Sequence, residues 1–382
     1  MIQKQRQISW VNTLFLTISP LLGIVGTAFY VYFNGVTRWE LIPFVVLCGF
    51  TGLSITGGYH RYFAHRSYKP NRIVELFYLI FGACAVQNSA LHWASDHRSH
   101  HRYTDTERDP YNAKEGFFHS HMGWIFYRDP SERSYDNVRD LQADPLVMWQ
   151  QRYYVPIAIV VGGLVPLLLG AVAGHPLGGF LWGGALRITL VHHSTFLINS
   201  WAHIFGTQPY ATTDSSRDCW WLAFLTNGEG YHNFHHKFQA DYRNGARWFQ
   251  WDPTKWLILG LSSLGLARRL HRVPQEVIIK ARIDAAMAQA ESRLGPLSWE
   301  ARTAMQEKLA IHRSRLAEIM TSWAHARARY VELRISAHKG SEEKLTHYKA
   351  LLRKHRADLR KATSEWTETL RAHNRQWGYQ TT

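Results

Sequence analysis

Residues 41–65 read LIPFVVLCGFTGLSITGGYHRYFAH. As a helix, the apolar segment up to Tyr59 is long enough to cross a hydrocarbon core of roughly 30 Å. It leads directly into His60 and His65, and neutral imidazole is a common protein ligand for Fe, Zn and Cu. This stretch therefore predicts a membrane protein with a metal site at one end of its spans.

Three further runs have the length and apolar composition of membrane spans. They cover residues 10–33, 153–173 and 177–199, and Trp and Tyr cluster near their ends as in an aromatic belt. A fifth run, residues 73–91, contains Glu75 and is expected to be a helix at the cytoplasmic surface. We predict an all-α integral membrane protein with four transmembrane helices and a cytoplasmic helical cap that holds a dimetal site.

Lys and Arg residues near the ends of the spans predict the orientation. Lys4 and Arg6 precede the first span, and basic residues follow the second span from Arg61 onwards. The loop between the third and fourth spans, residues 174–179, contains neither Lys nor Arg. Both termini and every histidine cluster are therefore expected on the cytoplasmic side.

Two more histidine clusters lie at residues 97–101 (HRSHH) and 232–236 (HNFHH). Histidines at positions i, i+3 and i+4 share one face of a helix, so each cluster can aim three imidazoles at one point. With His60 and His65, these side chains exceed what one ion uses, and two metals in one site is the simplest interpretation. Unrelated surface clusters are the alternative, which three such clusters in one membrane protein argue against.

The averages over the 382 residues, a net charge of +15 and a mean hydropathy of −0.27, suggest a soluble protein that binds nucleic acid. However, residues 1–267 are apolar and aromatic, whereas the rest is highly charged. Basic residues between spans and in the tail fit a cytoplasmic membrane face. We therefore expect the partner to be membrane lipid and not nucleic acid. The three cysteines are far apart and form no iron–sulfur or disulfide pattern.

Residues 268–297 are expected to link the membrane domain, residues 1–267, to a C-terminal domain, residues 298–382. In that domain, apolar residues recur at spacings of four and three on both sides of Gly340 and Ser341, which have the composition of a helix end and a helix start. Two such helices predict an antiparallel, coiled-coil-like hairpin. The hairpin could stabilise the protein, pack on the cap, form a homo-oligomer or dock an electron donor.

Longer motifs surround the histidines, at residues 93–101 (WASDHRSHH), 116–124 (GFFHSHMGW), 199–203 (NSWAH) and 228–236 (GEGYHNFHH). With residues 60–65, these motifs resemble the membrane-bound acyl-CoA desaturases of the stearoyl-CoA Δ9 type, over about residues 41–265. The resemblance implies that nine histidines hold two irons and that Asn199 holds a metal-bound water. The expected ligands are His60, His65, His97, His100, His101, His203, His232, His235 and His236.

Iron and O2 suit this chemistry. An unactivated C–H bond cannot be broken by acid–base catalysis, and imidazole ligation lets iron change its oxidation state while O2 binds. Reduction of O2 takes four electrons, of which the substrate supplies two. The sequence has no haem, flavin or iron–sulfur motif, so we expect an external donor of the ferredoxin, rubredoxin or cytochrome b5 type with its reductase. Zinc can occupy such a site in overexpressed protein, but it has no redox chemistry.

The resemblance also implies a narrow, kinked tunnel for the acyl tail. Gln87, Trp93 and Thr195 match the residues that shape the kink, and Cys48 and Gly52 would lie near the far end. Small side chains at Gly52 and Thr195 also permit close packing of helices, which is the alternative for these two positions.

Asn88 and Asp96 match positions that contact the CoA head group, although the family's arginine before that aspartate is Ser95 here. Long-chain acyl-CoA is the expected substrate, with acyl carrier protein or a glycerolipid as alternative acyl carriers. Cys48 is small and Tyr59 is large, the reverse of the animal members, so the preferred chain length stays open.

Other histidines near the motifs are expected to be structural, and some acidic residues are suitable acceptors for the ligand N–H groups. The structural histidines are His119, His121, His192 and His193, and the acceptors are Asp105, Asp109 and Glu229. His92 lies beside the second cluster and could contact its ligands.

The predicted function is the O2-dependent formation of a cis double bond, at Δ9, in a saturated acyl chain. A hydroxylase or alkane monooxygenase with the same histidine clusters is the first alternative, and a metal transporter is the second. A transporter would need polar ligands within its spans, whereas these histidines gather at one face.

Overall fold

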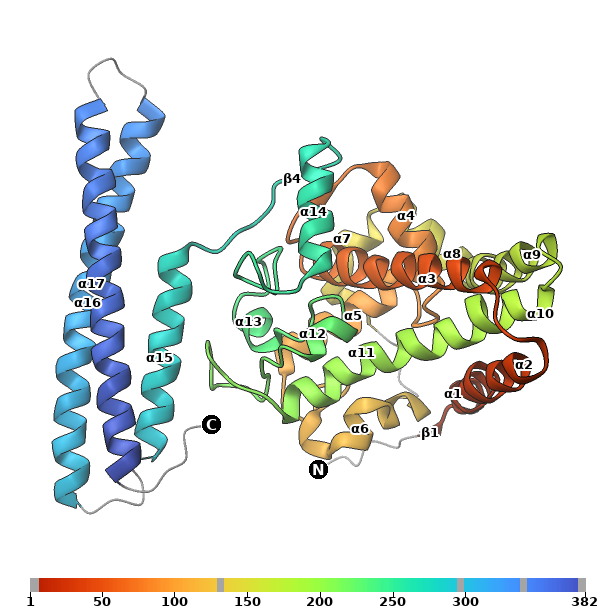
Figure 1. Ribbon diagram of the computed structural model, residues 1–382, viewed down its shortest axis with the longest axis horizontal. Coiled ribbons are helices and arrows are strands. Elements are labelled where there is room, and N and C mark those ends of the chain that lie inside the picture. Colours follow the sequence, from red (N-terminus) through yellow and green to blue (C-terminus); the bar gives the residue numbers. More distant parts are fainter. Residues whose placement is uncertain (1–6, 129–133, 294–298, 337–341, 377–382) are drawn as a thin grey trace. The chain divides into compact units, whose positions relative to one another are not determined.

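The computed structural model describes residues 7–128, 134–293, 299–336 and 342–376 (Figure 1). The described residues form two compact units. The first contains the residues up to 272 except 209–212, and the second contains 209–212 and the residues from 273 onwards. Each unit is described by itself below.

The first unit is built from helices, with two pairs of very short strands. Its helices are α1 (Trp10–Pro20), α2 (Thr27–Asn34), α3 (Arg38–Leu53), α4 (Arg72–Ala83), α5 (Ala90–Tyr103), α6 (Phe117–His121), α7 (Arg139–Gln142), α8 (Pro145–Ile159), α9 (Val165–Val172), α10 (Pro176–Gly179), α11 (Arg187–Ile204), α12 (Leu222–Leu225), α13 (His232–Lys237) and α14 (Pro253–Ser263). Strand β1 (Gln7–Ile8) pairs with β3 (Tyr127–Arg128), and β2 (Lys69–Pro70) pairs with β4 (Ala267–Arg268), both antiparallel.

Among the described residues, three continuous helices are long and apolar enough to cross a membrane: Trp10–Asn34, Arg38–Ala64 and Pro145–Val172. Large apolar side chains on these helices, such as Val11, Val45 and Val172, are exposed rather than buried, as expected for surfaces that contact lipid. These helices match the first three predicted spans.

The fourth predicted span, residues 177–199, is also helical, because α10 and α11 are joined by a π-helical segment, Phe180–Leu186. Whether this helix crosses the membrane stays a prediction. In the fifth apolar run, α4 ends at Ala83 after 12 residues, which is too short for a span.

The second long helix delivers the first histidine cluster. It begins at a capping box, in which the backbone N–H of Thr37 donates to Glu40 (2.6 Å). After α3 the helix continues in π-helical geometry over Ser54–Ala64, which contains His60, and His65 follows as the capping residue. Such π-helical turns are rare and occur frequently at functional sites.

The second unit contains α15 (Gln275–Arg293), α16 (Trp299–Ser336) and α17 (Glu342–Gln376). Helices α16 and α17 run antiparallel, since Arg315 pairs with Glu365 (2.6 Å) and Trp323 lies under Arg356. The predicted joint at residues 340–341 lies outside the described residues.

A single apolar core joins the three helices of the second unit. It contains Ile283, Met287, Ala290, Leu309, Leu316, Trp323, Leu359, Ala362 and Trp366. Residues 275–293, which fall in the predicted linker, therefore form a helix that packs on α16 and α17. The domain boundaries at 267 and 298 stay predictions.

We expect Leu316→Ala to destabilise the second unit by about 2–5 kcal/mol, because the side chain is 2% exposed and its loss leaves a cavity. Ile311→Ala, on the same helix but 68% exposed, should change the free energy of unfolding little. Hydrogen exchange of peptides from α16 and α17 in the full-length protein measures both. Equal protection in the two variants would show that these helices do not depend on this core.

Candidate metal centre

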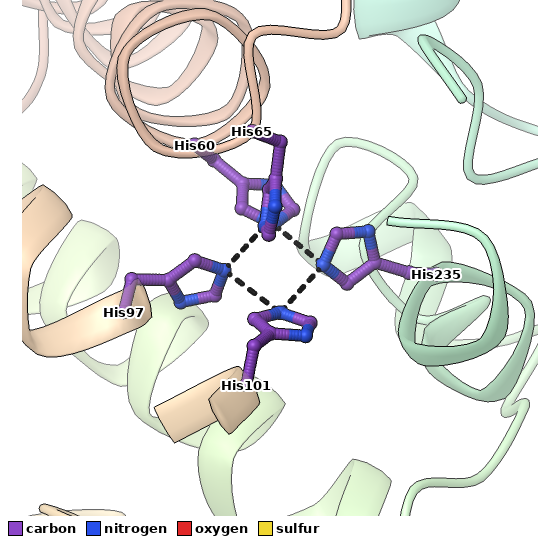
Figure 2. Close-up of side chains that lie close together, drawn as sticks. All are labelled: His60, His65, His97, His101 and His235. Carbon is purple, nitrogen blue, oxygen red and sulfur yellow. Dashed lines mark hydrogen bonds between the residues drawn. The ribbon is translucent and has the colours of Figure 1, made fainter. Parts of the chain in front are cut away.

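Nine histidine side chains, all of those expected as ligands, converge in the first unit in two groups. The first group contains His60, His65, His97, His101 and His235 (Figure 2). Its members come from three places in the sequence: the end of the Arg38–Ala64 helix, α5 and α13. Figure 2 shows their imidazole rings pointing toward one another, so the ring nitrogens face a common centre.

The second group contains His100, His203, His232 and His236, from α5, α11 and α13. Within each group the candidate ligand atoms all lie within 4.8 Å of one another. Helices α5 and α13 contribute to both groups and so place the two groups next to each other. His100 and His101, for example, are sequence neighbours whose ring centroids are 5.5 Å apart.

The expectation that each cluster aims three imidazoles at one point is wrong. His97 and His101 join one group while His100 joins the other, and the cluster on α13 divides in the same way. Residues at i and i+4 are stacked one turn apart, whereas the residue at i+3 is offset from them around the helix. Each cluster on α5 and α13 therefore supplies one pair to one group and one single histidine to the other.

The ring nitrogens of the first group are close enough to share one ion. The Nε2–Nε2 distances are 2.8 Å between His65 and His97, 3.1 Å between His97 and His101, and 3.0 Å between His101 and His235. Nitrogens bonded at about 2.1 Å to one ion lie about 3.0 Å apart at right angles and about 3.4 Å apart in a tetrahedron. The spacing is thus of the size expected for nitrogens that bind one metal ion.

Polar side chains behind the rings hold three of the outward-facing Nδ1 atoms. His100 Nδ1 lies 2.8 Å from Asp109 Oδ1, and His60 Nδ1 lies 2.9 Å from Glu229 Oε2. A Nδ1–H bound to an acceptor leaves Nε2 unprotonated, so its lone pair faces the centre. His97 Nδ1 faces the Tyr111 hydroxyl at 3.1 Å.

His203 reaches its acceptor through a relay. Its Nδ1 lies 2.8 Å from the hydroxyl oxygen of Ser215, which donates in turn to Asp105. Asp105 and Asp109 were among the three suitable acceptors in the sequence, but the role of Ser215 was not predicted. Its position in an irregular loop, twelve residues after His203, gives no sequence signal.

A buried ionic network holds the acceptor of His60. Arg61 is 1% exposed and donates to Glu229 (2.9 Å) and to Asp252 (2.9 Å). Asn244 also donates to Glu229. Removal of one member of such a network leaves an uncompensated buried charge, which is strongly destabilising. The sequence placed Arg61 beside a ligand but did not indicate its partner, Asp252.

Asp218 fixes the start of α13, because its Oδ1 accepts from the backbone N–H groups of Asn233 (2.9 Å) and Phe234 (3.1 Å). Burial raises the pKa of Asp218 to about 7. The two bonds orient the short helix that carries three of the histidines.

The histidines outside the spans are held in the form that binds metals. Burial, and then repulsion from neighbouring histidines, keeps the pKa values of His97, His101 and His235 well below that of a free imidazole. Neutral imidazoles with converging lone pairs are a donor set that first-row transition metals prefer. The residues present therefore fit a pair of bound metal ions.

Two cavities run beside the histidines. The larger has a volume of about 840 Å³ and the smaller about 300 Å³. Both are lined by Trp93, His97, Thr195 and Asn199, so the two spaces adjoin at the first histidine group. Asn199 lies one helical turn before His203 on α11, where the resemblance placed a holder of metal-bound water.

The residues expected at the tunnel kink lie together. Gln87 Nε2 donates to Thr195 Oγ1 (3.0 Å), and the Trp93 ring stacks on His97 with centroids 4.8 Å apart. Gln87 lines the larger cavity, and Trp93 and Thr195 line both.

The other expected substrate residues divide between the two cavities. Cys48 and Gly52 line the smaller one and Asn88 and Asp96 the larger. These placements agree with a tail end and a head-group end, whose roles stay predictions. The large Tyr59 side chain packs instead on Gly82 and accepts from Gln150 (2.6 Å).

The histidines expected to be structural lie outside both metal-binding groups. His121 Nε2 lies 3.0 Å from His193 Nδ1, and His121 Nδ1 lies 2.9 Å from Ser200 Oγ. His192 Nε2 lies 2.7 Å from the carbonyl oxygen of Ala85. His119 lies near Glu115, and His92 near Asp96.

An all-imidazole centre next to membrane helices defines a class of membrane metalloproteins, and sequence comparison identifies the family. Residues 37–263 match the family model described as fatty acid desaturase. The chain belongs to the fatty acid desaturase family.

Several relatives carry specific names. The chain is 39% identical over 296 residues to "Probable acyl-CoA desaturase" of Schizosaccharomyces pombe, covering 77% of this chain and 61% of the relative. It is 37% identical over 299 residues to "Acyl-CoA desaturase 1" of Saccharomyces cerevisiae, covering 77% of this chain and 58% of that protein. It is 37% identical to "sn-1 stearoyl-lipid 9-desaturase" of Anabaena variabilis, over 68% of this chain and 93% of the relative. The chain thus spans less than two thirds of the two yeast relatives.

We expect Asp109→Asn to weaken metal binding about tenfold to a hundredfold, because it removes the carboxylate that orients His100. Asp136→Asn is a matched control, since this carboxylate is exposed and contacts Arg139. Metal content after competition with a chelator, measured by mass spectrometry, compares the variants. Equal retention by both variants would show that Asp109 does not support the centre.

Proposed function

We propose that this protein is an O2-dependent diiron desaturase that forms a cis double bond, at Δ9, in a saturated long-chain acyl-CoA. The observation that carries this proposal is the convergence of nine imidazoles in two adjacent groups, beside cavities that could hold an acyl chain. Two irons bound there would activate O2 as the oxidant that cleaves the C–H bonds. The reaction balances as R–CH2–CH2–R′ + O2 + 2 electrons + 2 H⁺ giving R–CH=CH–R′ + 2 H2O.

The protein's own contribution is to place one pair of carbons beside the metals. The bond between Gln87 and Thr195 and the stack of Trp93 on His97 border the junction of the two cavities. An acyl chain that passes this point has to bend, which selects the carbons that react. Burial of the tail in the smaller cavity would contribute about 0.8 kcal/mol per methylene.

Of the three acyl carriers considered, CoA and a glycerolipid have support from the relatives. CoA is supported by the names of the two yeast relatives and by Asn88 and Asp96, which line the larger cavity. A glycerolipid is supported by the Anabaena variabilis relative, which the chain covers almost completely. Incubation of the reduced enzyme with a stearoyl thioester and with a stearoyl glycerolipid distinguishes them.

The two external electrons would come from a ferredoxin, a rubredoxin or a cytochrome b5, with its reductase. Such an electron donor has access to the site if both termini and the histidines face the cytoplasm, as the Lys and Arg distribution indicates. Protease digestion of intact and of opened membrane vesicles measures this orientation.

We expect a host that expresses the chain to gain monounsaturated fatty acids, and His101→Ala or His235→Ala to abolish this gain and lower bound iron. Each variant removes one nitrogen from the first group. His193→Ala should keep substantial activity, because it contacts His121 and lies outside the metal-binding groups. Fatty-acid profiles and iron content of membranes provide the measurement.

Other products would favour the alternatives. An alcohol in place of an alkene would indicate a hydroxylase, and metal flux into vesicles without any change in lipids would indicate a transporter. Full desaturation by His101→Ala or His235→Ala would contradict the diiron assignment.

We expect Gly52→Phe to shift the preference toward shorter acyl chains without moving the double bond. Gly52 lines the smaller cavity, and a Cβ there would already lie 2.6 Å from Asn227 Nδ2. The longest substrate should lose most, since it loses the most buried methylenes. Val46→Phe, an exposed position on the same helix, is the control. An unchanged profile in folded, iron-loaded Gly52→Phe would show that this face of α3 does not close the tunnel.

A further inference from the structure

Arg187 is a charged residue buried inside the membrane-associated helices. It is the first residue of α11 and is 1% exposed. Its guanidinium donates to the carbonyl oxygens of Gly183 (2.6 Å), Cys84 (2.8 Å) and Gly162 (3.0 Å), and to the Thr51 hydroxyl (3.1 Å). These acceptors lie on or next to four different helical segments, so one side chain joins all of them.

Each of these four acceptors is neutral. Arg61, another arginine that is 1% exposed, faces the carboxylates of Glu229 and Asp252, whereas Arg187 is held by carbonyl and hydroxyl dipoles. Burial of a guanidinium without a carboxylate partner costs free energy. Ionisable residues inside membrane helices usually serve a function. A planar group with several fixed donors is suited to hold backbone segments at set distances.

Two of the helices that meet at Arg187, α3 and its own helix α11, line the smaller cavity. Thr51 precedes Gly52 on α3, and Leu190 and Val191 follow Arg187 by one turn on α11. Gly52, Leu190 and Val191 line the smaller cavity, while Arg187 and Thr51 lie behind this wall. The bond between Arg187 and Thr51 therefore joins two helices that both line this cavity.

Close packing at these contacts leaves little freedom for another arrangement. A Cβ on Gly162 would lie 3.3 Å from the Arg187 guanidinium, and Thr51 is fully buried. Helices α3 and α11 are thus joined by a buried polar contact, next to small cavity-lining residues of α3 such as Cys48 and Gly49.

We propose that Arg187 is a positioning residue that sets the width and length of the acyl-tail cavity, and thereby the chain-length selectivity of the enzyme. This inference rests on the proposed desaturase function. Arg187 does not touch the substrate, since it acts by holding the helices that do. Its loss should let α3 and α11 move relative to each other, so that the enzyme discriminates less between acyl chains of different length.

The test compares Arg187→Met, Thr51→Val and the control Thr189→Val in the full-length protein. Thr51→Val removes a single acceptor of Arg187 and keeps the side-chain shape. Thr189 is buried on the same helix, but its hydroxyl donates to Ala185 (2.9 Å) and Ser19 (3.3 Å), away from the cavity lining.

Two saturated chains that differ by two carbons, chosen as the pair that the wild type discriminates best, compete in one reaction. The product ratio then equals the ratio of the two kcat/KM values and does not depend on the amount of folded enzyme. We expect this ratio to move at least about threefold toward unity in Arg187→Met and in the same direction in Thr51→Val. Thr189→Val should keep the wild-type ratio, and all variants should keep the position of the double bond.

Hydrogen exchange of peptides that cover residues 47–56 and 187–198 gives a second readout that needs no turnover. Faster exchange in both peptides of Arg187→Met and Thr51→Val, but not of Thr189→Val, is expected. An unchanged product ratio in both variants would overturn the proposal, and Thr51→Val provides this result even if Arg187→Met does not fold. A wild type that forms no double bond would overturn the desaturase function and the selectivity role together, whereas an active wild type with unaltered variants would overturn the selectivity role alone.

Discussion

The position of one proton on each imidazole controls the arrangement of this centre. A neutral ring has one N–H and one lone pair, so converging lone pairs require the N–H groups to point outward to acceptors. Asp109 and Ser215 lie within hydrogen-bonding distance of the Nδ1 atoms of His100 and His203, and Glu229 lies close to Nδ1 of His60. Asp109 and Glu229 are buried and need partners of their own, which the backbone N–H of Asp105 and the side chain of Arg61 provide.

Arg61 and Arg187 are both buried but bind different kinds of partner. Arg61 neutralises the carboxylates of Glu229 and Asp252, and thus offsets the free-energy cost of burying the charged residue behind His60. Arg187 binds neutral groups on several helices and acts on distances rather than on charge balance. One arginine supports the chemistry at the centre, and the other supports the shape of the space that leads away from it.

The sequence predicted the parts of the site that depend on local spacing. The histidines share short motifs, and the apolar runs that precede them are long, so both could be recognised without a structure. The division of each cluster between two groups could not, because it depends on which way α5 and α13 face each other. Asp252 was missed because its partner Arg61 lies 191 residues away, and Ser215 was missed because only folding places this residue of an irregular loop between His203 and Asp105. The helix α15 was not predicted because its apolar side chains become buried only when they pack against α16 and α17.

The π-helical segment at the first cluster has a consequence for how the motif can vary. The backbone N–H of His65 donates to the carbonyl oxygen of His60 (3.1 Å), a bond that spans five residues. This wide turn stacks His65 on His60 as an α-helical turn stacks His101 on His97. All three clusters thus follow one rule, a pair of ligands separated by one turn, and the extra residue of the first motif is absorbed by the larger turn. A residue can therefore be inserted or deleted between two such ligands only if the helical turn that joins them widens or tightens to match. The length of the motif is thus linked to the hydrogen-bond register of the backbone.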